Sequence, residues 1–347
     1  MLKKVLTLGL LATVWAMPAY AQTESFSDYE KTLYEAAKAE GSVVWYTSQF
    51  TAEISDAACK LFAARYAGVD CQSVRATGAV TFQRVMQEVQ AGAVQGDIFS
   101  TNDQTDLLEL MKVDALEQFA PRNLEFMSPV LTAMNESDGY FFVSSVSPFG
   151  IAYNTNLVTE EDAPKSWQDL LDPKWKDQIA IGHPGFSGST GLWTLALREL
   201  YGWEYFEKLN EGNPQVGRST ADGYNLVVSG ERKIAVTPIS LPLAGSLEGQ
   251  PVGTIYPTEG IMLPPSGTGI LAKSSHPNAA KLFAEFMLSQ EYSEFLRDLR
   301  RYPLRGDVTT AEGVEPLDSV KTLIVPLDEA VIGVVEVQEQ FRDTFGI

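Results

Sequence analysis

The alternation of predicted strands and helices limits the fold of this chain more than any other feature. Residues 42–47 (SVVWYT) form a β-branched and aromatic run, which is typical of a buried strand. Residues 79–92 carry apolar side chains at helical spacing and end at a glycine, which predicts a helix. Because short connections join such segments, we expect α/β architecture, with mostly parallel sheets covered by helices on both faces.

This pattern continues in two series along the chain. The first predicts strands at 42–47, 71–76 and 96–101, and helices over 51–67, 79–92 and 103–116. The second begins near residue 148 and predicts strands within 149–158, 177–181 and 233–240, and helices over 166–172, 189–200 and 220–230. The chain closes with a strand and a helix within 268–290 and an amphipathic helix over 328–345.

Small polar residues follow each of the first three predicted strands. Thr47 and Ser48 follow the first, Thr77 the second, and Asn102 and Asp103 the third. Ligands of parallel sheets bind outside the carboxyl ends of the strands. We therefore take these five residues as candidate ligand contacts, the alternative being ordinary polar loops.

The first 21 residues are typical of an export signal. Lys3 and Lys4 give a basic start, an apolar run follows, and Ala19 and Ala21 supply the small residues of a signal-peptidase site. We expect cleavage after Ala21 and a periplasmic protein, the alternative being a retained membrane anchor. No cysteine follows the apolar run, so we expect no lipoprotein anchor.

The remaining chain is long and acidic. Without 21 of its 347 residues it keeps 326, which is comfortable for two domains. It loses two of its 26 basic residues and none of its 45 acidic ones, which leaves a formal charge of −21. Such a chain repels phosphate backbones, and we expect no nucleic-acid partner.

Cys59 and Cys71 are the two cysteines of the sequence. In an exported protein this number predicts one disulfide, here between a helix and the strand that follows it. Two separate buried thiols are the alternative. Two cysteines and two histidines without close ligand spacing argue against a zinc or iron–sulfur site. We expect neither a metal site nor a cofactor.

Residues 179–197 (IAIGHPGFSGSTGLWTLAL) place glycines and hydroxyl residues where a predicted strand gives way to a helix. A helix N-terminus leaves about four amides unpaired and carries about half a positive charge. Gly188 lets a ligand approach the backbone, and Ser187, Ser189 and Thr190 add hydroxyl donors. The segment therefore predicts a seat for the acidic end of a ligand, the alternative being a helix cap.

A secreted serine hydrolase is the alternative from another functional class. Residues 185–189 (GFSGS) differ at one position from the G-x-S-x-G turn, which would make Ser187 the nucleophile. Asp222 and His276 follow in the order of a triad. However, Ser189 replaces the second glycine, and His276 lies at the start of a predicted helix. We therefore expect no enzyme.

Four segments carry a resemblance to a known family. They are 149–158 (FGIAYNTNLV), 164–181 (PKSWQDLLDPKWKDQIAI), 276–295 (HPNAAKLFAEFMLSQEYSEF) and 300–308 (RRYPLRGDV). These segments resemble the ferric-iron-type periplasmic solute-binding proteins of ABC importers. The resemblance implies a two-lobed, type II-like fold whose lobes are joined by crossover hinge strands. It also implies a monomeric receptor that binds a small polar solute, expected to be anionic, in the interlobe cleft and delivers it to an inner-membrane permease.

The implied lobes divide the chain in four pieces. We expect lobe 1 to hold 22–146 and 265–312, and lobe 2 to hold 147–264 and 313–347. The remaining candidate ligand contacts come from loops and strand ends of the second series, and they are Ser147, Arg218, Thr237, Ser240, Tyr256 and Glu259.

Two of these candidates are charged, and each can either bind a ligand or lie at the surface without a role in binding. The guanidinium of Arg218 can form paired hydrogen bonds to a carboxylate or phosphate, or a surface salt bridge. Glu259 can meet an amine or a metal, or be a solvated carboxylate of a turn.

The sequence departs from the ferric-binding pattern where the metal ligands lie. Members that bind ferric ion resemble one another in a pair of adjacent tyrosines, and here the matching stretch 235–242 offers Thr237 and Ser240 instead. The position of their glutamate ligand falls on Asn102 here. Neither replacement supplies an anionic ligand for Fe³⁺. A ferric iron or iron-complex binding protein is therefore kept as the alternative within the family.

Overall fold

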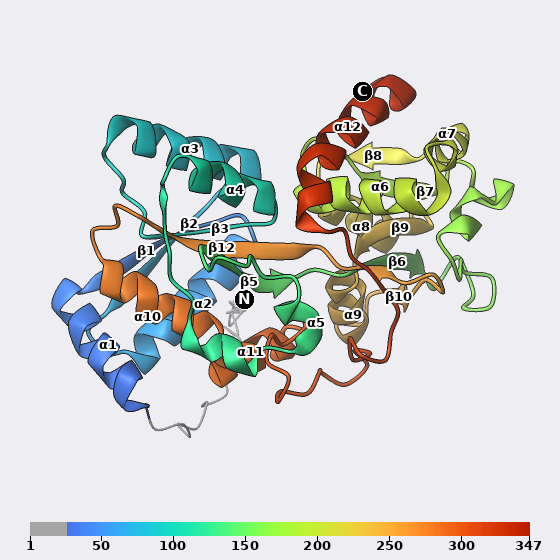
Figure 1. Cartoon of the computed structure of the whole chain (residues 1–347). Coiled ribbons are helices and arrows are strands. Elements are labelled where there is room, and N and C mark those ends of the chain that lie inside the picture. Colours follow the sequence, from blue (N-terminus) through green and yellow to red (C-terminus); the bar gives the residue numbers. More distant parts are fainter. Residues whose placement is uncertain (1–25) are drawn as a thin grey trace, which may run out of the picture.

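Two lobes lie side by side and are joined near the middle of the molecule (Figure 1). The computed structural model describes residues 26–347, so the predicted signal segment and its cleavage site lie outside the described residues. No helix in this described part is long and apolar enough to cross a bilayer.

The first lobe holds the N-terminal series and a later return of the chain. Its strands are β1 (Ser42–Thr47), β2 (Asp70–Arg75), β3 (Ile98–Thr101), β4 (Leu116–Glu117), β5 (Phe141–Val146) and β12 (Pro265–Leu271). Its helices are α1 (Asp28–Glu40), α2 (Ala52–Arg65), α3 (Gly78–Ala91), α4 (Gln104–Lys112), η1 (Arg122–Phe126), α5 (Pro129–Thr132), α10 (Pro277–Met287) and α11 (Gln290–Asp298).

The second lobe holds the second series and the C-terminal helix. Its strands are β6 (Phe149–Asn154), β7 (Ile179–Gly182), β8 (Gln215–Gly217), β9 (Ile234–Pro238), β10 (Val252–Ile255), β11 (Ile261–Met262) and β13 (Thr322–Leu323). Its helices are η2 (Gln168–Leu171), η3 (Pro173–Trp175), α6 (Gly188–Tyr201), α7 (Glu204–Glu211), α8 (Thr220–Ser229), α9 (Ser240–Leu247) and α12 (Leu327–Phe345).

Each lobe is built on one mixed sheet. Within the described residues the first has the order β2-β1-β3-β12-β4 with β5 paired to β12, and the second has the order β13-β11-β6-β9-β7-β8 with β10 paired to β6. β1 runs parallel to β2 and β3, and β7 runs parallel to β8 and β9. β12 runs antiparallel to β3, β4 and β5, and β6 runs antiparallel to β9, β10 and β11. The sheets are therefore mixed rather than mostly parallel, because strands that arrive from the other lobe enter in the opposite direction.

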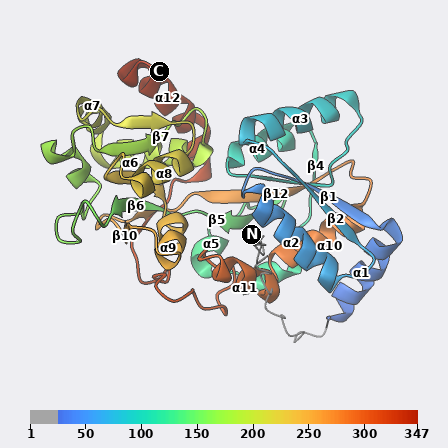
Figure 2. The ribbon, with the colours of Figure 1, turned by 180° about the vertical axis from the view of Figure 1, so that it is seen from behind.

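The chain crosses between the lobes from β5 to β6 and from β11 to β12, and once more between α11 and β13. Figure 2 shows these connections from behind, where β12 lies between the lobes. The lobe boundaries that we expect, at residues 147, 265 and 313, remain our proposal. The first two fall between strands of different sheets.

Alternating side chains of the strands explain why helices cover both faces of the first sheet. Val43 and Trp45 point into the cluster shared with α1, α2 and α10, whereas Tyr46 points into the cluster shared with α3 and α4. Successive residues of a strand face opposite sides, so a run that is apolar throughout needs cover on both. Figure 1 shows α3 and α4 on one side of this sheet and α1 and α10 on the other.

The first core continues beneath the junction of the lobes. Ile239 and Leu263 of the second lobe belong to the same buried cluster as Trp45 and Phe283 of the first. The second lobe has its own core around Trp167 and Trp193.

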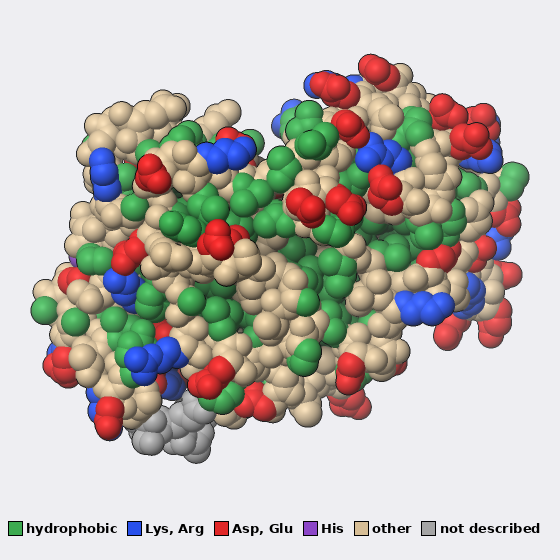
Figure 3. Space-filling model, viewed as in Figure 1, with side chains coloured by type: hydrophobic (Ala, Val, Ile, Leu, Met, Phe, Trp, Pro, Cys, Tyr) green, Lys and Arg blue, Asp and Glu red, His purple; other side chains and the backbone are tan. Residues whose placement is uncertain are grey.

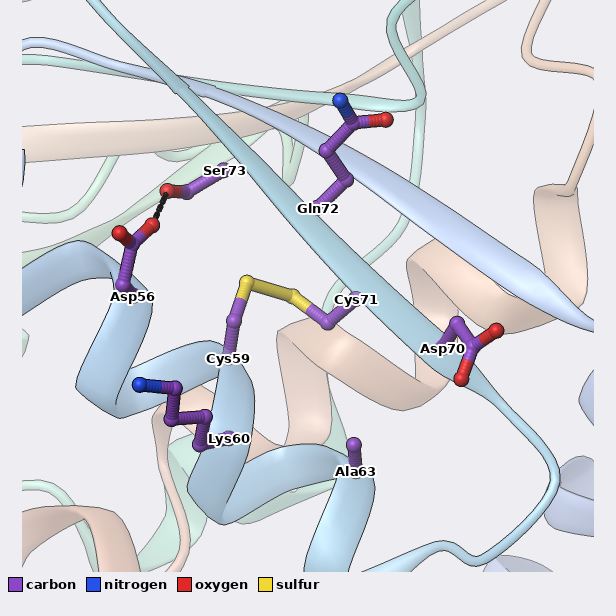
Figure 4. A pocket seen from close by; sticks show the side chains of 8 residues that line it. All are labelled: Asp56, Cys59, Lys60, Ala63, Asp70, Cys71, Gln72 and Ser73. Atoms are coloured by element: carbon purple, nitrogen blue, oxygen red, sulfur yellow. Dashed lines mark hydrogen bonds between the residues drawn. A yellow bond between two sulfur atoms is a disulfide. The ribbon is translucent and has the colours of Figure 1, made fainter.

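Cys59 of α2 and Cys71 of β2 form the predicted disulfide. Figure 4 shows the bond between the helix and the strand, beside a hydrogen bond from the Ser73 hydroxyl to Asp56. The same residues line a surface depression of about 320 Å³.

Removal of this disulfide is expected to destabilise the first lobe. The two cysteines are 12 residues apart in sequence, and a loop of that size contributes about 3 kcal/mol in the chain-entropy model. We expect the variant Cys59→Ala/Cys71→Ala to lose about that much free energy of unfolding in urea. A reducing agent serves as the control, since it is expected to lower the stability of the wild type and leave the variant unchanged. Equal midpoints for both proteins would contradict the prediction.

Candidate functional site

A groove opens between the lobes. Figure 3 shows the surface hollowed at one edge, between the side of the first lobe that carries α3 and α4 and the side of the second that carries α12. α4 and α12 are in contact beneath it. The carboxyl ends of β1 and β3 and the N-terminus of α6 meet here, as the contacts below show.

The wall of the first lobe joins the ends of three elements. Ser48 follows β1. Its hydroxyl contacts the Asn102 side-chain oxygen at 3.4 Å and accepts from the Asn102 backbone N–H at the same distance. Gly78 begins α3 beside both residues, because a Cβ placed there would lie 3.4 Å from the Asn102 oxygen and 3.7 Å from the Ser48 hydroxyl. Three of the predicted strand ends are therefore brought together.

The wall of the second lobe is the start of α6. Ser187 is the N-cap, and its hydroxyl accepts from the Thr190 amide at 3.3 Å. The amides of Gly188 and Ser189 have no acceptor among the described residues. Two unpaired amides at the positive end of a 14-residue helix form a place where an anion is stabilised.

A buried hydroxyl lies under this helix start. Thr190 is 1% exposed, and its Oγ1 has no hydrogen-bond partner within residues 26–347. The side chain points toward β7, since a Cβ on Gly182 would lie 2.7 Å from this oxygen. Thr220 lies against the same glycine, and the Thr237 hydroxyl donates to the Thr220 carbonyl at 3.3 Å.

The two walls touch at Gly188. A Cβ on this residue would lie 2.9 Å from the Cβ of Asp103 and 3.1 Å from the Asn102 carbonyl oxygen. Real Cβ atoms essentially never approach another atom within 3.0 Å, so a side chain at this position would force one of the walls to shift. The structure therefore has its lobes together, with the unpaired amides of α6 next to the end of β3.

Two acidic residues lie on the first-lobe side of this contact. Asp103 caps α4 and accepts from the amide and hydroxyl of Thr105 at 3.0 and 2.6 Å. Asp106 accepts from the Thr101 hydroxyl at 2.8 Å. Burial, with the negative charge of Asp103, raises the pKa of Asp106 to about 8. The raised pKa favours the uncharged form of Asp106, which lowers the repulsion that an anion would meet here.

Another group of residues surrounds the crossover between β5 and β6. The Arg301 Nη1 lies 3.5 Å from the Ser147 hydroxyl, and its guanidinium carbon lies 5.0 Å from the centre of the Phe50 ring. Burial lowers the pKa of Arg301 to about 10, so the side chain stays charged at neutral pH.

Sequence reasoning missed Arg301 because it lies in a run that is typical of surface charge. Arg297 pairs with Asp298 and Arg305 with Asp307, and the sequence does not show that Arg301 differs from them. The pair Arg300 and Arg301 directly before a Tyr-Pro step was the available signal.

Several predicted site residues have other contacts. Glu259 accepts from the Trp167 and Gln168 amides at 3.2 and 3.4 Å and from the Tyr201 hydroxyl, which uses the carboxylate inside the second lobe. Tyr256 accepts from the Glu315 amide at 3.4 Å, away from the α6 start. The structure does not bring these two side chains to the groove contacts.

The other candidates lie at element ends. Thr77 is the N-cap of α3, and the Thr47 hydroxyl accepts from the Gln49 amide at 3.2 Å. Ser240 begins α9, and its buried hydroxyl has no hydrogen-bond partner in the described part of the chain. Arg218 is exposed, 5.9 Å from the ring of Phe186 near the start of α6.

The residues of the hydrolase alternative do not come together. The Ser187 hydroxyl caps α6, and Asp222 forms a capping box with Ser219. His276 lies in the other lobe, where its ring contacts Asp97 at 3.0 Å and Ser42 at 3.3 Å. The neighbouring amides of α10 bind Glu40, so they are not free to stabilise an oxyanion.

No group of three or more His, Cys, Asp and Glu side chains is placed to hold a metal ion within residues 26–347. A group of that kind is how proteins usually bind a transition metal.

Comparison with known proteins agrees with this arrangement. The model of the bacterial extracellular solute-binding protein family matches residues 97–328, about two thirds of the chain. The chain belongs to this family. The two-lobed fold and the family that the sequence predicted are confirmed, and this solute-binding protein is the binding component of an ABC import system.

Similar proteins span almost the whole chain. A Salmonella typhimurium periplasmic protein assigned to 2-aminoethylphosphonate binding is 24% identical over 308 residues, covering 85% of this chain and 84% of its own. Among solved structures, AfuA from Actinobacillus pleuropneumoniae with fructose-6-phosphate has a TM-score of 0.79 at 21% identity, covering 88% of this chain and 99% of AfuA. Iron-bound HitA from Pseudomonas aeruginosa has a TM-score of 0.75 at 21% identity, covering 87% of this chain and 99% of HitA. At these identities the structures establish the fold.

Proposed function

We propose that this solute-binding protein captures a small anionic solute in the periplasm and passes it, unaltered, to an inner-membrane permease. The solute carries a phosphoryl, phosphonate or carboxylate group. The protein acts as a monomer after its signal segment has been removed at Ala21.

One observation supports the anionic solute above the others. The amides of Gly188 and Ser189 have no acceptor among the described residues, although they lie where the two lobes touch. An unpaired amide shielded from water costs about 1–3 kcal/mol. A bound oxyanion removes that cost and gains the favourable field of the helix. The Salmonella relative, assigned to a phosphonate, agrees with this class of solute.

A thermal-shift screen tests this proposal. The samples are inorganic phosphate, 2-aminoethylphosphonate, fructose 6-phosphate, a set of carboxylates, a set of amines and ferric citrate. We expect at least one oxyanion to raise the melting temperature and to be recovered chemically unchanged. A response limited to amines, or a coloured ferric complex that survives excess citrate, would refute an anionic solute. The second outcome would restore the ferric alternative, in which phenolate ligands give the colour.

A further inference from the structure

Arg301 is a charged side chain without an acidic partner. Among residues 26–347, no carboxylate oxygen lies within 4.0 Å of its guanidinium. The chain has 45 acidic and 26 basic residues, so the missing partner does not reflect a shortage of carboxylates. A partly buried cation needs a counter-charge to offset its lost hydration.

The surroundings of Arg301 do not offset this loss. Its Nη1 has one long contact of 3.5 Å, to the Ser147 hydroxyl. Phe50 lies against the guanidinium and is 2% exposed. The Tyr292 hydroxyl, which interacts electrostatically with Arg301, is buried and has no hydrogen-bond partner among the described residues. Four of the five N–H groups of the guanidinium therefore have no acceptor among the described residues.

A second arginine approaches the same residue. Arg75, the last residue of β2, donates its Nε to the Phe50 carbonyl at 2.9 Å. It also has no carboxylate within 4.0 Å among the described residues. Two guanidinium groups that have no carboxylate within 4.0 Å among the described residues thus contact Phe50, one at the ring and one at the backbone.

Phe50 and its neighbours connect this place to the groove. Ser48 contacts Asn102 in the wall described above. Gln49, between them, is 9% exposed and donates to the Ser144 hydroxyl at 2.7 Å and to the Gly267 carbonyl at 3.3 Å. Its Oε1 is buried without a partner. Segment 48–50 therefore runs from the wall at Ser48 to Phe50, which both arginines contact.

Resting on the proposed anionic solute, we propose that Arg301, assisted by Arg75, binds a phosphoryl or phosphonate group of the solute at the crossover between the lobes. Two guanidinium groups match a dianion, and each can form paired hydrogen bonds to its oxygens. A carboxylate carries one charge and needs one such partner. The free Gln49 oxygen accepts from an ammonium or hydroxyl group elsewhere on the same solute.

The test compares probes that differ only in their acidic group. 2-Aminoethylphosphonate and β-alanine share an aminoethyl chain and differ in phosphonate against carboxylate; fructose 6-phosphate and inorganic phosphate complete the set. Calorimetric titration is carried out with the wild type, Arg301→Gln, Arg301→Lys and Arg75→Gln. Arg300→Gln is the matched control, because Arg300 is next to Arg301 in the sequence and this substitution also removes one positive charge.

We expect the phosphoryl or phosphonate probe with the highest affinity to bind Arg301→Gln about 10- to 100-fold more weakly than the wild type. Arg301→Lys is expected to recover part of this loss, and Arg300→Gln to bind as the wild type does. The unliganded Arg301→Gln protein is expected to melt at the same or a higher temperature, since the change removes an uncompensated charge. A structural role for Arg301 predicts a lower melting temperature instead.

Three outcomes would overturn this assignment. If Arg301→Gln binds the probes with wild-type affinity, Arg301 does not bind the solute. A lower melting temperature with an equal loss for every probe makes the residue structural. Preference for β-alanine over all phosphoryl and phosphonate probes refutes the dianion but leaves the proposed anionic solute in place, whereas failure of every anion to bind refutes both.

Discussion

Replacement of Gly188 by leucine is expected to weaken solute binding at least 1,000-fold while the protein stays folded. Even a Cβ added at this position would lie 2.9 Å from the Cβ of Asp103 and 3.1 Å from the Asn102 carbonyl oxygen. A larger side chain keeps the lobes apart, so the solute loses its contacts with one wall. Gly188→Ala is expected to bind the solute about 10- to 100-fold more weakly, because overpacking by one methyl group costs about 1–3 kcal/mol.

The melting temperatures of the unliganded variants are the folding control for this series. Gly188 is the first residue of α6, where alanine and leucine are better helix formers than glycine. The unliganded variants are therefore expected to melt at or above the wild-type temperature. Gly223→Ala is the matched helical control, since its Cβ would meet neighbours of the same lobe at 3.4 Å or more. If Gly188→Leu binds as the wild type does, the lobes do not close at this contact.

A negative charge at Ser189 is expected to exclude an anionic solute. In Ser189→Glu the new carboxylate lies at the unpaired amides of Gly188 and Ser189 and takes the place of the solute anion. Each hydrogen bond to a charged group is worth about 1.5–3 kcal/mol, so the loss of two corresponds to about 1,000-fold in affinity. The helix itself is expected to be stabilised, because acidic residues favour its first turn.

Ser189→Gln separates charge from size in this experiment. Glutamine has nearly the same shape as glutamate but no charge, and we expect it to weaken binding far less. Titration calorimetry measures both variants, with melting temperatures as the folding control. Tighter binding in Ser189→Glu would show that the solute presents a cation to this helix. Equal losses in both variants would show that only the space matters.

The local pattern of the sequence was sufficient to predict most of the fold. The run from Val43 to Tyr46 is apolar on both sides, and the structure covers both sides with helices. The predicted helix at 166–172 is a short 3₁₀ turn, Gln168–Leu171, because Pro173 follows and an α-helix cannot continue through it. Direction within the sheets could not be predicted, since nothing local in β6 or β12 shows from which lobe the strand arrives.

The candidate site, like the fold, was predictable from the sequence only in part. The start of α6 was predictable because Gly188 and its hydroxyl neighbours form a local pattern. The contact of Gly188 with Asp103 was not, since it joins residues from different lobes. Arg301 was overlooked because pairing distinguishes it from Arg297 and Arg305, and pairing is a property of the folded chain. Glu259 is a polar residue at a turn, and only the structure shows that its carboxylate is already used.

The most direct test is a crystal structure of the protein with the anion that gives the largest thermal shift. The account predicts this solute between the lobes, with its acidic group accepting from the Gly188 and Ser189 amides. It also predicts the contact of Gly188 with Asp103 in the bound state. A solute bound outside the groove, or one whose cationic end faces the start of α6, would contradict the account.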